Sequence, residues 1–382
     1  MKNISLFWIF LILLVLGCKK EEQREPIVLG AIYNLTGGQA SLDTPSSKGA
    51  QLAVQQANEA GGVRDQLLEL LLKDGQTNPD TLKAKVKEVL EEAPEAVAFL
   101  GLSDTDQVLA AAGEAASHQR VFLTSGATSP LLPGQIPDYL FLACFGDNVQ
   151  AAAAAEYAYD TLGATSVSIL YDSTDTYPRL LQGYFIDRFE ELGGQVKSQK
   201  AYSAGSLETA VQETQPADII FFAALPQDVL PGIQLIRQAG LNVPVVGGDS
   251  YDEPGAWQGQ SQLGEIYFTT HAYLGADNPN PAVQSFRQSY LNAYGGEEPN
   301  AFAALGYDAA RLLIRAAEQS DTIDPEAIRL SLTEIQDFDG VTGTISFGAD
   351  SRIPSKSVTI MEVVDGSQQF VQELTPKKIP TP

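Results

Sequence analysis

The sequence predicts an α/β protein with two doubly wound, Rossmann-like lobes. Apolar strand patterns alternate with helix patterns from residue 26 to residue 124, and the same alternation restarts after residue 146. Many of the strand patterns are unbroken apolar runs, as expected of parallel strands that helices cover on both faces. At 382 residues the chain is long enough for two domains of ordinary size.

In the first half, four strands alternate with three helices. The strands are predicted at residues 27–33, 67–73, 96–101 and 121–124. Two helices are predicted to start at Thr44-Pro45 and Asn78-Pro79, where a capping residue precedes proline, and the third spans 105–117. Residues 139–144 are then a short apolar segment that crosses to the second half.

The second half repeats the pattern and ends in helices with no strand between them. Strands are predicted at 166–171, 196–202, 218–223, 243–247 and 266–270, with helices at 148–162, 178–192, 207–213 and 229–239. Helices follow near 281–294, 300–319 and 325–335, and the final strands are at 341–347 and 357–364. Because helices alone cannot form a third α/β domain, we expect them to pack on the first sheet.

The predicted domains are therefore discontinuous in sequence and joined by several crossings. They are a signal peptide at 1–17, a lipidated cysteine and tether at 18–25, a first lobe from 26–145 plus 271–350, a second lobe from 146–270 plus 351–375, and a tail at 376–382. The crossings would act as hinges between the lobes.

The N-terminus has the pattern of a bacterial lipoprotein signal. Lys2 precedes an almost entirely apolar stretch at 4–16, which is too short for a stable transmembrane helix. The stretch leads into VLGC, ending at Cys18, which resembles the lipobox in which cleavage precedes a cysteine that is then lipid-modified. We therefore expect a protein on the periplasmic or cell-surface side of a bacterial membrane, anchored through Cys18. An ordinary secretory signal with an incidental cysteine is the alternative.

Charge and composition argue against several function classes. The chain carries 24 Lys and Arg against 48 Asp and Glu, a formal charge of −24, so no basic face for nucleic acid is expected. Cys144 has no partner cysteine, and His118 and His271 lie far apart in a chain without CxxC, so neither a disulfide nor a metal site is expected. No dinucleotide-binding or P-loop motif is present, so no cofactor is expected.

An enzyme is also a poor match to the sequence. The block GDS at 248–250 resembles a lipase motif only superficially, because in those enzymes the block follows the first strand and a DxxH motif supplies the base. Neither histidine of this chain has an aspartate three positions before it. We therefore predict no catalytic residues.

Residues 120–130, RVFLTSGATSP, are the strongest candidate for a binding segment. A buried strand at 121–123 runs directly into small polar residues and Gly126, and Pro130 ends any regular structure. In open α/β sheets, ligands bind at the carboxyl edge of the strands, and glycine lets a ligand approach the backbone closely. An ordinary exit from strand to loop is the alternative.

Sequence blocks in both halves follow one another in an informative order. They are LGAIYNLTGGQA, KGAQLAVQQANEAGGV, LLKDGQTNPDTLKAKVKEVL, FLGLSDTDQ and FLTSGATSP, then AAAAAEYAYDTLGATSVSILYD, IIFFAALPQDVLPGIQLIRQAGL, VPVVGGDS and GVTGTISF. This order resembles the type I periplasmic binding proteins of the branched-chain amino-acid transporter group, over nearly all of residues 26–375. The resemblance implies a solute-binding partner of an ABC importer, with two lobes on a multi-crossing hinge that close over a ligand.

The resemblance also implies which residues of the first lobe hold the ligand. In the SGATSP block, relatives bind a ligand carboxylate with backbone N–H groups and a threonine hydroxyl, which here fall at Gly126, Ala127 and Thr128. Aligned N–H groups and a nearby helix start both favour an anion. Relatives add a serine after the preceding strand. Thr105 matches it best by its distance from Thr128, and Ser103 second.

The second lobe would hold the other end of the ligand. Tyr177 matches a family tyrosine that closes over the ligand, and Asp249 matches an acidic residue that pairs with its α-ammonium. A helix cap or turn residue is the alternative for Asp249. Leu225 stands where relatives have a second tyrosine, so the side-chain pocket differs. Asp104 and Asp106 are unusual beside a carboxylate site: they either point to solvent or argue against an anionic ligand.

The expected function is capture of a small zwitterion, in the first place a neutral or apolar amino acid of branched-chain type, without covalent chemistry. The expected partners are that ligand and an ABC permease. Membrane contact is expected through the N-terminal lipid only, and a monomer is the family expectation. One alternative keeps the fold but binds an amide, a urea-like compound or an aromatic acid. Another is a ligand-sensing receptor.

Overall fold

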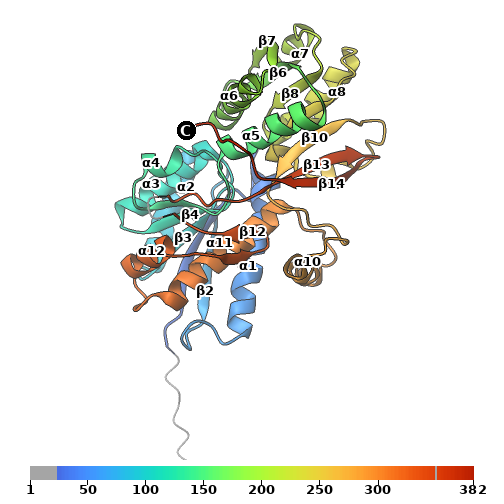
Figure 1. Ribbon diagram of the computed structural model, residues 1–382. Coiled ribbons are helices and arrows are strands. Elements are labelled where there is room, and N and C mark those ends of the chain that lie inside the picture. Colours follow the sequence, from blue (N-terminus) through green and yellow to red (C-terminus); the bar gives the residue numbers. More distant parts are fainter. Residues whose placement is uncertain (1–23, 349–350) are drawn as a thin grey trace, which may run out of the picture.

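The computed structural model describes residues 24–348 and 351–382, so the signal peptide and Cys18 lie outside the described residues. It contains two lobes, each built around its own sheet (Figure 1). The first lobe has a five-stranded sheet of order β2-β1-β3-β4-β5, and the second a seven-stranded sheet of order β14-β13-β10-β9-β8-β6-β7. The predicted fold class is confirmed. Within the described ranges, every helix is too short or too polar to span a bilayer.

The sheet of the first lobe is entirely parallel. Its strands are β1 (Ile27–Tyr33), β2 (Leu68–Asp74), β3 (Ala98–Gly101), β4 (Val121–Thr124) and β5 (Leu140–Leu142). The helices α1 (Ala40–Glu59), α2 (Pro79–Glu92), α3 (Thr105–Ser117) and α4 (Leu132–Gln135) connect them. The prediction that residues 139–144 only cross between lobes is wrong: Phe141 pairs with Leu123, so this buried apolar run adds a strand before the chain leaves the lobe.

The first predicted helix, α1, starts before its predicted Thr-Pro cap. Its N-cap is Gln39, and Pro45 lies inside the helix. The buried carboxylate of Asp43 accepts the N–H of Asn34 at 2.8 Å, and the N–H of Gln39 donates to Thr77 Oγ1 at 3.2 Å. These tertiary bonds hold the first turn, which explains why local capping signals misplaced the helix start.

The second lobe has a mixed sheet. Its strands are β6 (Ser166–Asp172), β7 (Gln195–Tyr202), β8 (Ile219–Ala223), β9 (Val245–Gly247), β10 (Ile266–Thr270), β13 (Val358–Val364) and β14 (Ser367–Leu374). Its helical segments are α5 (Asp147–Glu156), the π-helical turn η1 (Tyr157–Thr161), α6 (Thr176–Glu191), α7 (Leu207–Gln212), α8 (Pro226–Gln238), the 3₁₀ turn η2 (Asp249–Tyr251) and α9 (Pro254–Trp257). The strand β14 was not predicted, because SQQFVQEL is largely polar and forms a partly exposed edge antiparallel to β13.

The last three helices return to the first lobe, as expected. They are α10 (Pro281–Ala293), α11 (Ala301–Gln319) and α12 (Pro325–Thr333). Residues of α11 and α12 share a buried core with β1, β3 and β4. Close packing of α1 on α11 requires glycine, because a Cβ at Gly49 would lie 1.9 Å from the carbonyl oxygen of Ala303. The predicted strand at 341–347 is instead a hairpin of β11 (Phe338–Gly340) and β12 (Gly343–Ile345).

Among the elements that the structure describes, the chain passes between the lobes three times: between β5 and α5, between β10 and α10, and between β12 and β13. At the third crossing, the N–H of Leu142 donates to the Arg352 carbonyl at 2.9 Å, so this part of the segment still lies on the first lobe. The C-terminal residues lie along α5: the Lys377 N–H donates to Glu156 at 3.0 Å, and Asn148 Nδ2 donates to the Pro380 carbonyl at 3.0 Å.

Candidate ligand-binding site

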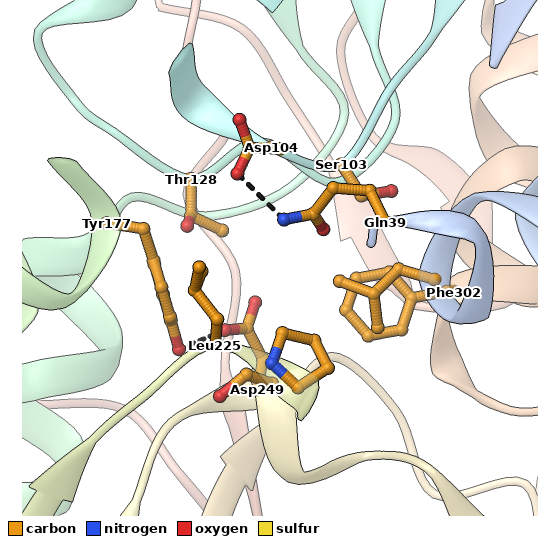
Figure 2. Close-up of a pocket in the computed structure, with 11 residues that line it drawn as sticks. Gln39, Ser103, Asp104, Thr128, Tyr177, Leu225, Asp249 and Phe302 are labelled. Atoms are coloured by element: carbon orange, nitrogen blue, oxygen red, sulfur yellow. Dashed lines mark hydrogen bonds between the residues drawn. The ribbon is translucent and has the colours of Figure 1, made fainter. Parts of the chain in front are cut away.

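A pocket with an empty volume of about 300 Å³ lies between the two lobes (Figure 2). It is lined by Gln39, Leu42, Ser103, Asp104, Thr128, Tyr177, Leu225, Pro226, Asp249, Ser250 and Phe302. Most of these residues follow the carboxyl ends of strands β3, β4, β8 and β9. The pocket therefore occupies the place where open α/β sheets bind ligands.

On the first-lobe side, the pocket is lined by hydroxyl groups. Ser103 and Thr128 both line it, and Figure 2 shows them on the same side as Asp104. Ser103 Oγ and Thr105 Oγ1 are buried and have no hydrogen-bond partner among the described residues. A buried hydroxyl without a partner costs about 1–3 kcal/mol. Ser103 also lies beside the buried carboxyl group of Asp43, whose pKa it lowers. Ser103 lines the pocket and can contact a ligand there, whereas Thr105 is not among the lining residues.

The predicted backbone donors at Gly126 and Ala127 are already occupied in this conformation. The Gly126 N–H donates to the Leu102 carbonyl at 3.1 Å, and the Ala127 N–H donates to Thr124 Oγ1 at 3.2 Å. Neither residue lines the pocket. Gly126 instead provides space, because a Cβ there would lie 2.8 Å from Ser103 Oγ.

Asp104 faces the pocket and does not point to solvent. It is 4% exposed, and Oδ1 accepts the Gln107 N–H at 2.8 Å, which caps α3. Oδ2 accepts from Gln39 Nε2 at 3.0 Å (Figure 2). Burial, and then the negative charge of Asp175, raise the pKa of Asp104 to about 8. A protonated Asp104 would not repel an anionic ligand, so its presence is compatible with a bound carboxylate.

Asp249 provides the charged group of the second-lobe side. It is 4% exposed, and Oδ1 accepts from the Tyr177 hydroxyl at 2.7 Å and from Gln150 Nε2 at 3.4 Å. Oδ2 lies 2.9 Å from His271 Nε2. Burial raises the pKa of Tyr177 well above its ordinary value, so Tyr177 keeps its proton and donates it to this bond. The carboxylate is thus fixed by side chains from separate elements and directed to the pocket (Figure 2).

Several residues of the site escaped the sequence interpretation. Gln150 lies in α5 beside an alanine run, and His271 directly follows β10. Asp147 is fully buried, accepts from Gln150 Nε2 at 3.1 Å, and has its pKa raised to about 8, chiefly by burial. Phe302, at the start of α11, contributes apolar surface from a distant part of the chain. No local motif marks these positions, because only the fold brings them to Asp249.

A hydrogen bond also joins the two lobes beside the pocket. The Thr176 N–H at the N-terminus of α6 donates to Asp106 Oδ2 at 3.1 Å. Asp106 therefore does not simply point to solvent. Since Tyr177 is the next residue of α6, this bond between lobes helps to hold the tyrosine over the pocket.

Known proteins resemble this chain over most of its length. A Leu/Ile/Val-binding protein homolog 1 from Brucella suis is 22% identical over 359 residues, covering 91% of this chain and 94% of its own. The branched-chain amino acid transporter substrate-binding protein LivJ from Streptococcus pneumoniae, solved with isoleucine, has a TM-score of 0.84 at 25% identity and covers 92% of this chain and 100% of its own. A solute-binding protein of an ABC transporter from Rhodopseudomonas palustris, solved with 3,4-dihydroxybenzoic acid, has a TM-score of 0.80 at 20% identity, with 93% and 99% coverage.

A family model described as periplasmic binding protein matches residues 26–368, which is most of the chain. The match includes every segment that lines the pocket and all strands of both sheets except most of β14. This family consists of solute-binding proteins. The chain belongs to the periplasmic binding protein family.

Proposed function

We propose that this protein is the substrate-binding component of an ABC importer and captures a small zwitterion, in the first place a neutral or apolar amino acid. The observation that carries this proposal is the charge of the pocket. Asp104 and Asp249 are the acidic residues among those that line it, and no lysine or arginine is among them. Because burial raises the pKa of Asp104 to about 8, Asp104 is largely protonated at pH 7, and Asp249 supplies the negative charge. A buried carboxylate is stabilised by a partner of opposite charge. The ligand's ammonium would supply that partner for Asp249.

The rest of the pocket matches the other parts of an amino acid. The hydroxyls of Ser103 and Thr128, on the side opposite Asp249, would donate to the ligand carboxylate (Figure 2). Leu42, Leu225 and Phe302 offer apolar surface to a side chain. The Brucella relative is named for leucine, isoleucine and valine, and the Streptococcus protein was solved with isoleucine, which supports a branched side chain.

The test is a calorimetric titration with ligands that differ by one group. Leucine carries both charged groups, 4-methylpentanoic acid lacks the amine, and isoamylamine lacks the carboxylate. We expect leucine to bind and each analogue to bind at least about tenfold more weakly, because each leaves one buried polar side without its partner. Binding of the acid with undiminished affinity would contradict the assignment of Asp249 to an ammonium.

An amide, a urea-like compound or an aromatic acid is the second candidate ligand. Two observations favour it: Asp104 lies in the pocket, and Leu225 gives the second lobe an aliphatic side chain where an aromatic one was expected. The Rhodopseudomonas neighbour was solved with an aromatic acid. Such ligands have no ammonium, so they would bind equally well to Asp249→Asn. An amino acid would not.

The cellular setting is proposed from the sequence. We propose lipid on Cys18, a location on the periplasmic or cell-surface side, a monomeric state, no catalytic activity, and delivery of ligand to an ABC permease rather than signalling. Mass spectrometry of the mature N-terminal peptide tests the lipid, and Cys18→Ser should release the protein from the membrane fraction. Uptake of labelled ligand that stops when the gene is deleted would support transport over sensing.

A further inference from the structure

His271 lies directly behind the ligand-facing carboxylate, at the hinge. It follows β10 at the second crossing, and its side chain is fully buried. Nε2 is 2.9 Å from Asp249 Oδ2. Its ring stacks on Phe145, at the first crossing, with centroids 4.0 Å apart and an interplanar angle of 26°. The same histidine makes a T-shaped contact with Phe302, a lining residue, with ring centroids 6.2 Å apart.

The geometry defines the hydrogen bond between His271 and Asp249. A carboxylate can only accept, so Nε2 carries the proton and donates it. Nδ1 is buried and has no partner among the described residues, so the structure provides no acceptor for a second ring proton. Burial lowers the pKa of His271 below its ordinary value, although contact with Asp249 opposes this shift. The ring is therefore neutral at pH 7.

Other charged groups near His271 act in both directions. Lys356, buried at the third crossing with Nζ 3.3 Å from the Ala143 carbonyl, further disfavours a positive ring. Asp147 lies in the same buried region, where burial and the negative charge of Asp249 raise its pKa to about 8, so Asp147 is largely protonated at pH 7. Among these groups, only Asp249 bonds directly to the ring. A positively charged His271 would form an ion pair with Asp249 and offset the negative charge that the carboxylate presents to a ligand.

We propose that His271 is a positioning residue for the amine end of the ligand: as a neutral donor anchored on the hinge, it orients Asp249, and its protonation would cancel the charge that an ammonium requires. The inference rests on the proposed capture of an amino acid. It makes amine binding depend on a side chain that does not itself line the pocket. It also links the ligand-binding carboxylate to the stacked residues of two crossings, about which the lobes close.

The first experiment measures the leucine dissociation constant from pH 5 to pH 7.5 for the wild-type protein and for His271→Gln. Glutamine keeps an N–H donor toward Asp249 but cannot take up a proton. In the wild type, leucine affinity should decrease as the pH falls below the pKa of His271, by up to roughly tenfold per pH unit. The reason is that binding of each ammonium releases one proton from His271. The His271→Gln variant should lack this part of the pH dependence. Any pH dependence that arises from the carboxyl groups of the pocket is present in both proteins and cancels when they are compared. Equal pH profiles would overturn the proposal.

The second experiment uses the wild-type protein, so it does not depend on folding of a variant. The chain contains two histidines, and His118 has a 48% exposed side chain beside Glu114 at the end of α3. Imidazole nitrogen spectra should show His271 as the neutral Nε2–H tautomer at pH 7, and saturating leucine should move its titration to lower pH but leave His118 unchanged. A charged His271 at pH 7, or a titration that leucine does not move, would overturn the proposal.

The two proposals can fail separately. If leucine binds but His271 does not respond, the role of His271 is wrong and amino-acid capture stands. If neither leucine nor another amine binds the wild-type protein, the proposed function is wrong and the role of His271 is wrong with it.

Discussion

The two sides of the pocket differ in how far their hydrogen bonds are already made. On the second lobe, the Asp249 carboxylate is held by Tyr177, Gln150 and His271 without any ligand. On the first lobe, the buried hydroxyls of Ser103 and Thr105 have no partner among the described residues. The second lobe therefore presents a preorganised charge, and the first lobe presents donors that a ligand must satisfy. Preorganisation of one side reduces the cost of binding there.

The largest effect is expected from removing the preorganised charge. Asp249→Ala should weaken leucine binding by about 2–5 kcal/mol, or roughly 30-fold to several thousand-fold in Kd, because the ammonium would be buried without a partner. Isothermal calorimetry measures this, and circular dichroism melting verifies that the variant folds. If Asp249→Ala lowers leucine affinity by less than about threefold, the two sides of the pocket do not differ as described.

The next effect tests the groups that hold this charge. Tyr177→Phe removes the 2.7 Å bond to Asp249. A hydrogen bond to a charged group contributes about 1.5–3 kcal/mol, so leucine affinity should fall by roughly tenfold to a hundredfold. Tyr184→Phe is the matched control, since Tyr184 lies on the same helix and does not line the pocket. Similar losses in both variants would point to a general change in α6.

A smaller loss of leucine affinity, without a loss of stability, is expected on the first-lobe side. Ser103→Ala should weaken leucine binding by about 0.5–1.5 kcal/mol, yet leave the melting temperature of the ligand-free protein unchanged or higher, because it removes a buried hydroxyl that lacks a partner. Thr105→Val is the matched control behind the pocket and should raise stability with less effect on affinity. If Ser103→Ala lowers the ligand-free melting temperature, the hydroxyl has a structural partner.

A separate prediction concerns the pH dependence of stability, rather than leucine affinity, on the same side of the pocket. Burial raises the pKa of Asp104 to about 8 and that of Asp43 to about 7, whereas both lie near 4 in an unfolded chain. The folded state therefore binds more protons between pH 4 and pH 8, so the free energy of unfolding should decrease as pH rises through this range. In Asp104→Asn, the free energy of unfolding should decrease less with pH than in the wild type. Chemical denaturation at pH 5, 7 and 8.5 measures this difference. An unchanged slope would contradict the assignment to Asp104.

Strongly patterned segments were predictable from sequence. Val121–Thr124 and Thr105–Ser117 were placed to the residue, because an unbroken apolar run and a clear helix pattern need no tertiary information. The Asn78 cap of α2 was also predicted correctly, since its side chain accepts the N–H groups of Asp80 and Thr81. The start of α1, the strand β5 and the polar strand β14 were not, because long-range pairing decides each of them.

The residues of the candidate site were likewise only partly predictable from the sequence. Ser103, Thr128, Tyr177 and Asp249 follow strand ends or begin a helix in recognisable blocks, and the structure places all of them around one pocket. Gly126 and Ala127 were recognisable too, but their N–H groups are used within the first lobe. The sequence shows the residue type, but it does not show whether the backbone N–H of that residue is already used in a hydrogen bond within the protein.

The sequence by itself determined the two-lobed α/β class, the strand ends that carry the site and the excess of acidic residues, because these follow from local periodicity and residue type. Only the tertiary structure decided how those residues are paired. It brought Gln150 and His271 to Asp249, stacked His271 on Phe145, and buried Asp104 beside Gln39. These contacts join residues far apart in the chain, and the burial that shifts the pKa of Asp104 and of His271 arises only when the lobes assemble.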